Sequence, residues 1–146
     1  MEAIREQINR IRNLKINNIL YDILSDKRIQ KFIIELNTKE QLFNEGVNSN
    51  NVIIGRYTPS TYEDKIRKFD ASFPRHYTLL DTGEFYESFE IIVQKEAFII
   101  TADGQKEDDN LFEKYGDDIV GLTEESMTKL IEKLKPLIID QIHDSI

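Results

Sequence analysis

The stretch LLDTGEFYESFEIIVQKEAFIITA, residues 79–102, holds the two short elements around which the rest of the chain is expected to fold. The tripeptide DTG at 81–83 precedes residues that suit a short helix, and Thr82 is placed to cap it. From Phe89 onward the hydrophobic period shifts towards two, which is typical of a half-buried strand. A second β-rich run at 97–102 follows after a three-residue connection, so the pattern predicts a hairpin. A hairpin alone is marginal in water, and we therefore expect it to pack on helices.

Helices are expected on both sides of this stretch. Apolar residues at helical spacing predict a helix over residues 3–24 and a second one, capped by Ser25-Asp26, that ends at Gly46. Asn37-Thr38 either interrupts or continues that second helix. Thr123 is placed to cap a last helix, in which Pro136 predicts a kink or a restart.

The segments between these helices are shorter and less regular. A loop is expected at 46–51, followed by an extended piece over 52–57. Thr58-Pro59 then reads as a cap with proline at the first helical position, and predicts a short helix to about Phe69. Residues 70–77 are the best candidate for a mobile loop.

These elements sum to an α+β fold, with terminal helices packed around a small antiparallel sheet or hairpin. The 146 residues suit one structural domain. We divide it into N-terminal helices (1–45), a signature and hairpin region (46–122) and a C-terminal helix (123–146).

Composition excludes several functions. The formal charge is −8, and the basic residues are scattered, so the basic footprint of a nucleic-acid binder is missing. There is no cysteine, which excludes disulfides and thiolate metal sites. No run approaches the roughly 20 apolar residues of a membrane span. We expect a protein made in the cytosol, with no membrane partner.

No catalytic or metal-binding constellation is visible, so we expect no cofactor and no enzyme. His76 and His143 stand far apart without a paired motif and are expected on the solvated surface. The acids 107–109 and 117–118 do not fit a calcium loop, because Asp103-Gly104-Gln105 breaks the required ligand order. A solvated acidic loop is the simpler interpretation.

Residues 79–88 resemble the Leu-x-x-Thr-Gly-x-Leu-x-x-Ser signature of phage tail-completion and virion-morphogenesis proteins, a head–tail joining or neck family, with Phe85 in place of the usual Leu. The upstream segment 55–61 is similar to the family's Tyr-Ser-Pro-x-Thr segment, and 120–125 is similar to the Leu-Gly-Leu-Ser that opens its final helix. The resemblance implies a structural motif without catalytic residues, made of Tyr57, Pro59, Thr61, Leu80, Thr82, Gly83, Phe85, Ser88 and Gly121. In physical terms, Gly83 is expected to let the backbone pass close by, and Phe85 with Phe89 to anchor helix to hairpin.

The resemblance implies a bacteriophage structural protein of the neck or tail terminus, located in the virion and assembled in the host cytoplasm. Its partners would be copies of itself in a ring, portal or connector and tail proteins, and genome DNA that passes through without specific binding. The aromatic residues of the middle third are either hydrophobic core with loop anchors or part of an interface, where aromatic residues are enriched. The interface candidates are Phe73, Tyr77, Tyr86 and Phe98. The acidic residues 107–109 are expected either at the ring lumen or on the outside.

The alternative function is a small acidic DNA mimic or adaptor that inhibits a host DNA-binding protein. It would explain the net charge, but it predicts acids gathered in one stripe. Asp and Glu instead interleave with Lys and Arg in most segments.

Overall fold

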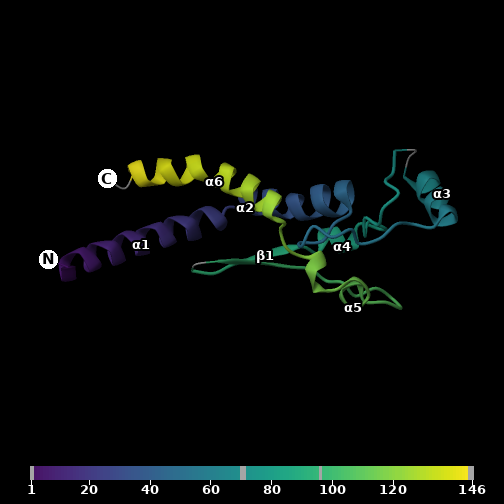
Figure 1. Ribbon diagram of the computed structural model, residues 1–146, viewed down its shortest axis with the longest axis horizontal. Helices are drawn as coiled ribbons and strands as arrows, with labels where there is room; N and C mark the ends of the chain where they lie inside the picture. Colours follow the sequence, from purple (N-terminus) through teal and green to yellow (C-terminus); the bar gives the residue numbers. More distant parts are fainter. Residues whose placement is uncertain (1, 70–71, 96, 145–146) are drawn as a thin grey trace.

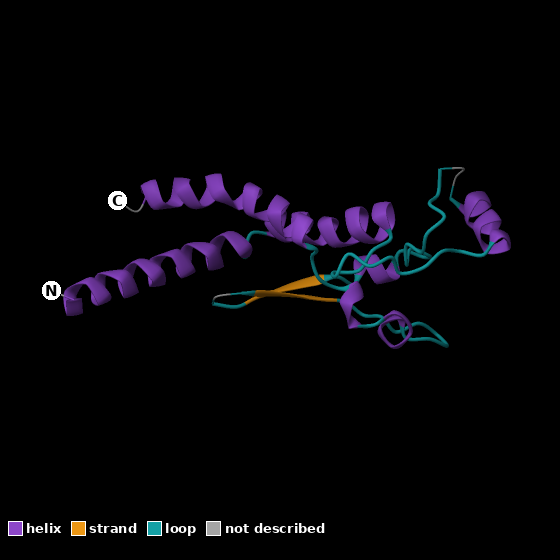
Figure 2. Ribbon diagram, in the orientation of Figure 1, coloured by secondary structure: helices purple, strands orange, loops and turns teal. Residues whose placement is uncertain are grey.

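The computed structural model describes residues 2–69, 72–95 and 97–144, apart from the side chains of residues 10–15. Two long helices, α1 (Glu2–Leu24) and α6 (Glu124–Asp144), contact each other near the middle of an elongated molecule and separate towards the termini (Figure 1). The helices α2 (Lys27–Glu35) and η1 (Leu36–Glu45) continue the same layer. Figure 2 shows the hairpin of β1 (Glu90–Val93) and β2 (Phe98–Thr101) beneath it, which confirms the α+β prediction.

Shorter helices lie at the end of the molecule opposite the termini (Figure 1). They are α3 (Pro59–Lys68), α4 (Glu84–Glu87), α5 (Leu111–Tyr115) and the 3-10 turn η2 (Asp117–Ile119). Among the described residues, no helix is both long and apolar enough to cross a bilayer.

The hairpin is held by one face. The strands pair antiparallel, with Ile91 opposite Ile100 and Val93 opposite Phe98. These four side chains pack on a buried cluster from the helical layer, made of Ile23, Leu24, Ile29, Ile33, Leu36, Leu130 and Leu134. The predicted alternation is therefore confirmed.

A second core cluster joins α4 to the start of the hairpin. Phe85 and Phe89 are both buried, with ring centroids 5.1 Å apart in an edge-to-face arrangement, as expected. They pack with Leu42, Leu79, Leu111 and Ile119. This cluster links η1, the signature segment and α5.

The second predicted helix does not end at Asn37-Thr38. It continues as η1, a π-helix, to Gly46, whose φ of 67° closes it as predicted. Two buried amides project from η1 to the segment before α6. Asn37 accepts a hydrogen bond from the Gly121 N–H (2.8 Å) and donates to the Ile119 carbonyl (3.1 Å). Gln41 likewise donates to the Gly121 carbonyl (2.8 Å) and accepts from the Thr123 N–H (3.0 Å).

Three predicted helix caps, each formed by a side chain close in sequence to the backbone group that it binds, are confirmed. The Asp26 side chain accepts from the Arg28 N–H, and the Thr58 hydroxyl accepts from the Thr61 N–H with Pro59 at the first helical turn. Thr123 accepts from the Ser126 N–H at 3.1 Å. Of the two outcomes expected at Pro136, a kink or a restart, the restart does not occur, because α6 is one helix from residue 124 to 144.

The central loops are more packed than expected. The extended piece 52–57 forms only isolated bridges, Val47 with Ile53 and Arg56 with His76. In the segment predicted to be mobile, residues 70–71 lie outside the described residues. His76 is half-buried against Gly46, with Nε2 donating to the Phe43 carbonyl at 2.6 Å, so its placement on the solvated surface was wrong.

Candidate functional site

The signature segment works partly as expected. Gly83, not Thr82, is the N-cap residue of α4, and the Thr82 hydroxyl only accepts a long hydrogen bond from the Glu84 N–H at 3.4 Å. A side chain at Gly83 would meet only the Glu87 carboxylate, at 3.9 Å, so the predicted close backbone approach is wrong. The glycine is needed for another reason, its φ of 92°.

Ser88 connects α4 to the backbone that follows β2, at the open end of the hairpin. Its hydroxyl donates to the Phe85 carbonyl at 2.6 Å and accepts from the Asp103 N–H at 2.9 Å. Ser88 therefore closes the base of the hairpin, a structural role of the kind that the resemblance implies.

The motif residues do not converge on one site. Tyr57 and Leu80 line a pocket between α3 and α5. Pro59 lines a different pocket, which it shares with Tyr57, and Thr61 lies in the first turn of α3. Gly121 is bound to the η1 amides in another part of the fold.

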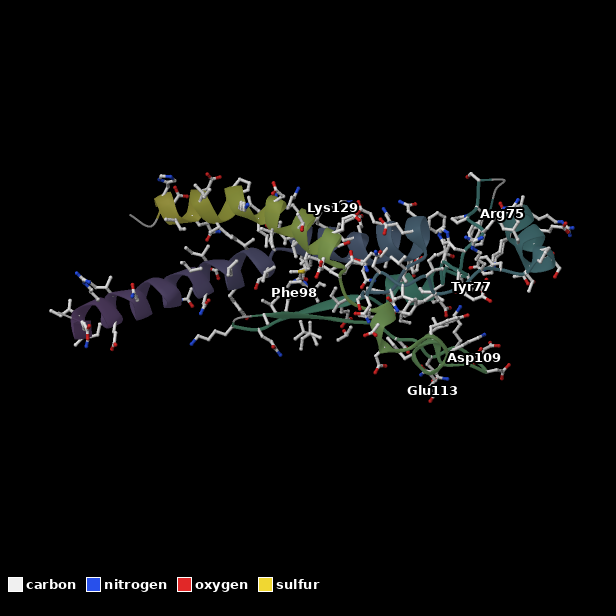
Figure 3. The ribbon with its side chains drawn as sticks, viewed as in Figure 1. Arg75, Tyr77, Phe98, Asp109, Glu113 and Lys129 are labelled. Atoms are coloured by element: carbon white, nitrogen blue, oxygen red, sulfur yellow. The ribbon has the colours of Figure 1, made fainter. Side chains whose placement is uncertain are left out.

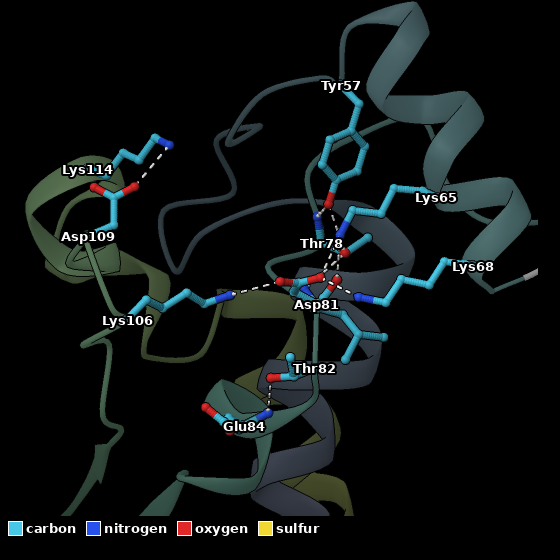
Figure 4. Close-up of polar contacts among 11 residues, drawn as sticks. Tyr57, Lys65, Lys68, Thr78, Asp81, Thr82, Glu84, Lys106, Asp109 and Lys114 are labelled. Carbon is cyan, nitrogen blue, oxygen red and sulfur yellow. Dashed lines mark hydrogen bonds and ion pairs between the residues drawn. The ribbon is translucent and has the colours of Figure 1, made fainter.

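The first of these pockets is the candidate site, and we call it the lysine pocket. It encloses about 250 Å³. Figure 4 shows Asp81 at its centre, with lysines reaching it from two elements. Lys68 Nζ lies 2.7 Å and Lys65 Nζ 3.6 Å from Asp81 Oδ1, and Lys106 Nζ lies 3.9 Å from Oδ2.

The α3 helix positions two of these lysines. Lys65 and Lys68 are three residues apart and so lie on the same helical face. The Lys65 side chain is only 15% exposed, and its ammonium donates to the Leu80 carbonyl at 3.1 Å. It also lies 5.5 Å from the centroid of the Tyr57 ring, a cation–π distance.

Tyrosines form the wall between α3 and α5. Tyr77 packs edge-on against Tyr57 (4.9 Å between centroids) and against Tyr115 (5.7 Å). The Tyr57 hydroxyl lies 3.2 Å from Thr78 Oγ1, which fixes the ring. Burial raises the pKa of Tyr115. This wall is preformed by ring packing.

The pocket carries an excess of positive charge. Lys114 pairs with Asp109 at 3.5 Å, so four ammonium groups share two carboxylates. The hydrogen bond from Lys68, with the charges of Lys65 and Lys106, lowers the pKa of Asp81. In a chain of net charge −8, this local excess is unusual, and its charge is of the sign that an anionic group requires.

The four interface candidates have different environments. Phe73 is 4% exposed, and its ring packs against those of Phe43, Tyr57 and Phe69 within the subunit. Tyr86 is mostly covered, and its hydroxyl donates to the Thr78 carbonyl; burial raises its pKa. Figure 3 shows Tyr77 at the same end of the molecule as Asp109, and apart from Phe98 in the hairpin. Phe98 is half-buried against the helical layer.

The lysine pocket was not predicted. Its lysines come from two separate segments, residues 65–68 and 106–114, and in the sequence the basic residues are scattered. The spacing of Lys65 and Lys68 was the only local signal. Among the described residues, no group of three or more histidines, aspartates or glutamates is placed to hold a metal ion.

Comparisons with known proteins give no relative: no family model, no curated protein and no solved structure matches this chain.

Proposed function

We propose that the chain is a bacteriophage structural protein of the neck or tail terminus, which forms a homo-oligomeric ring joining portal or connector to tail. The observation that carries the proposal is an uncovered helical arm. Residues 2–9 of α1 are all exposed, among them Ile4 (58%) and Ile8 (44%). A helix as short as residues 2–9 is only marginally stable in water on its own, so this arm needs a partner.

Apolar side chains are also exposed elsewhere. Val52 and Ile53 are exposed in the central loops, while Ile131 and Ile139 are exposed on α6. The terminal arms and the α3 end lie at opposite ends of the molecule (Figure 1). Two different patches on one subunit are what a head-to-tail contact requires, and such contacts form a ring when the rotation between successive subunits closes.

The signature resemblance adds support from the sequence, because its residues serve structural roles here. Ser88 closes the hairpin base and Gly121 receives the η1 amides. The alternative, an acidic DNA mimic, is disfavoured by ion pairs that place lysine or arginine beside acids on α2, α3 and α6 and between α5 and the loop before it.

Light scattering of the purified chain tests the proposal. We expect an oligomer several times the 17.2 kDa subunit mass, with a ring outline in negative-stain images. Ile8→Glu should give monomers with an unchanged circular dichroism spectrum, because a charge would be buried in the contact. The matched control is Asn18→Glu, which adds the same charge at an exposed polar position of α1 and should still assemble. A wild-type chain that stays monomeric at high concentration would contradict the proposal.

A further inference from the structure

The lysine pocket has more cations than its own carboxylates balance. Three ammonium groups lie within 3.9 Å of one carboxylate, Asp81, and Lys65 is largely withdrawn from water. Like charges held together repel, and the repulsion is stronger where solvent is excluded. An additional anion entering the pocket would relieve it.

The chain itself offers such an anion at its other end. Asp140 and Asp144 are exposed, and one turn apart they share a face of α6. Neither forms an ion pair within the described part of the chain. Ile139, beside Asp140, is exposed as well. Figure 1 places this end of α6 opposite α3, the helix that supplies Lys65 and Lys68.

We infer that the lysine pocket receives the carboxylates of Asp140 and Asp144 from a neighbouring copy of the chain. This inference rests on the proposed ring, because a head-to-tail contact joins opposite ends of successive subunits. Of the three lysines around Asp81, Lys68 and Lys106 have the more exposed side chains, and their charge is opposite to that of the two aspartates. Complementary charges of this kind fix the register of a contact and exclude wrong partners.

Lysines beside tyrosines also suit nucleic acid, but two features favour the protein partner. Glu107 and Asp108 are exposed on the loop between the pocket residues Lys106 and Asp109, where they would repel a polyanion. The tyrosine rings pack edge-to-face on one another, which leaves less open ring face for stacked bases.

Charge exchange between two variants tests the inference. One variant carries Lys68→Glu and Lys106→Glu, and the other carries Asp140→Lys and Asp144→Lys. Each alone places like charges in the contact, so its self-association should weaken at least about tenfold. Mixed in equal amounts, each variant supplies the complement of the other, and association should return. Glu132→Lys with Asp22→Lys, on exposed helical positions, gives the matched charge control and should assemble normally.

The outcomes separate this inference from the proposed function. If the wild type and both variants assemble equally well, or if mixing restores nothing, the contact is not the lysine pocket, although the ring stands. If the wild type is monomeric, the ring proposal fails and the inference with it. If the pocket variant loses binding to a labelled oligonucleotide while assembling normally, the pocket is a nucleic-acid site and the inference is overturned. Should the double lysine variant fail to fold, Lys106→Glu alone, whose ammonium is the most distant from Asp81, replaces it.

Discussion

Gly83 and Ser88 show how single residues of the signature segment act. The φ of Gly83 is 92°, a conformation that side chains with a Cβ rarely adopt, and it turns the chain into α4. Ser88 then binds both the end of α4 and the strand exit at Asp103. The conformational requirement at Gly83 and the two hydrogen bonds of Ser88 hold the same short helix from both ends.

We predict that Gly83→Val destabilises the protein by about 1–3 kcal/mol, because a β-branched residue is strained at positive φ. Crowding plays no part, since the nearest atom to the added Cβ is 3.9 Å away. Gly83→Asn is the control and should cost less, because asparagine tolerates positive φ better than valine. Thermal melts measure both. Equal melting temperatures for valine and glycine at this position would contradict the argument.

At the scale of elements, η1 organises the segment before α6. Its two side-chain amides make four hydrogen bonds to the backbone of residues 119–123. Asn37 and Gln41 are both buried, so the backbone groups they satisfy have little access to water. An unsatisfied buried polar group is costly, and these amides therefore hold the start of α6 against η1.

We predict that Asn37→Ala and Gln41→Ala each lower the free energy of unfolding by about 1–3 kcal/mol, as expected when buried backbone groups lose their partners. Urea denaturation measures the loss. The control is Asn44→Ala, an exposed asparagine of the same helix, which should change stability little. If the variant that combines Asn37→Ala and Gln41→Ala loses no more free energy of unfolding than Asn44→Ala, the two amides do not hold the segment before α6.

At the scale of the whole molecule, the lysine pocket and the acidic loop are neighbours of opposite charge. Glu107 and Asp108 are exposed, and Asp109 pairs with Lys114 across exposed side chains. In the proposed ring, this loop lies close to the subunit contact. We propose that it faces the lumen, where acidic groups would repel DNA and allow it to slide.

Lysine at positions 107, 108 and 109 should leave folding intact, because exposed charge pairs contribute little to stability. The substituted ring should gain duplex binding that weakens with salt, and particles carrying it should eject DNA more slowly. Lysine at the exposed positions 84, 87 and 90 makes the same charge change outside this loop and serves as control. Normal ejection, with rings that bind no duplex at low salt, would place the loop outside the lumen.

The elements of this protein were predictable where their causes are local. The caps at Asp26, Thr58 and Thr123 are confirmed, as is the hairpin with its inward-facing isoleucines. Each cap depends on residues within about one helical turn, and the hairpin depends on strict alternation of apolar residues. Both patterns can be recognised in the sequence.

What the sequence alone left open depends on groups far apart in the chain. Asn37 meets Gly121 across 84 positions, and the lysine pocket joins α3 to the loop before α5. Hydrophobic periodicity in the sequence does not predict such contacts, because they form only when packing of the two core clusters brings the segments together. His76, expected on the solvated surface, is half-buried against Gly46, a contact across thirty positions of the chain. Local order was thus determined by neighbours in sequence, and the site by the hydrophobic burial that closes the long loops.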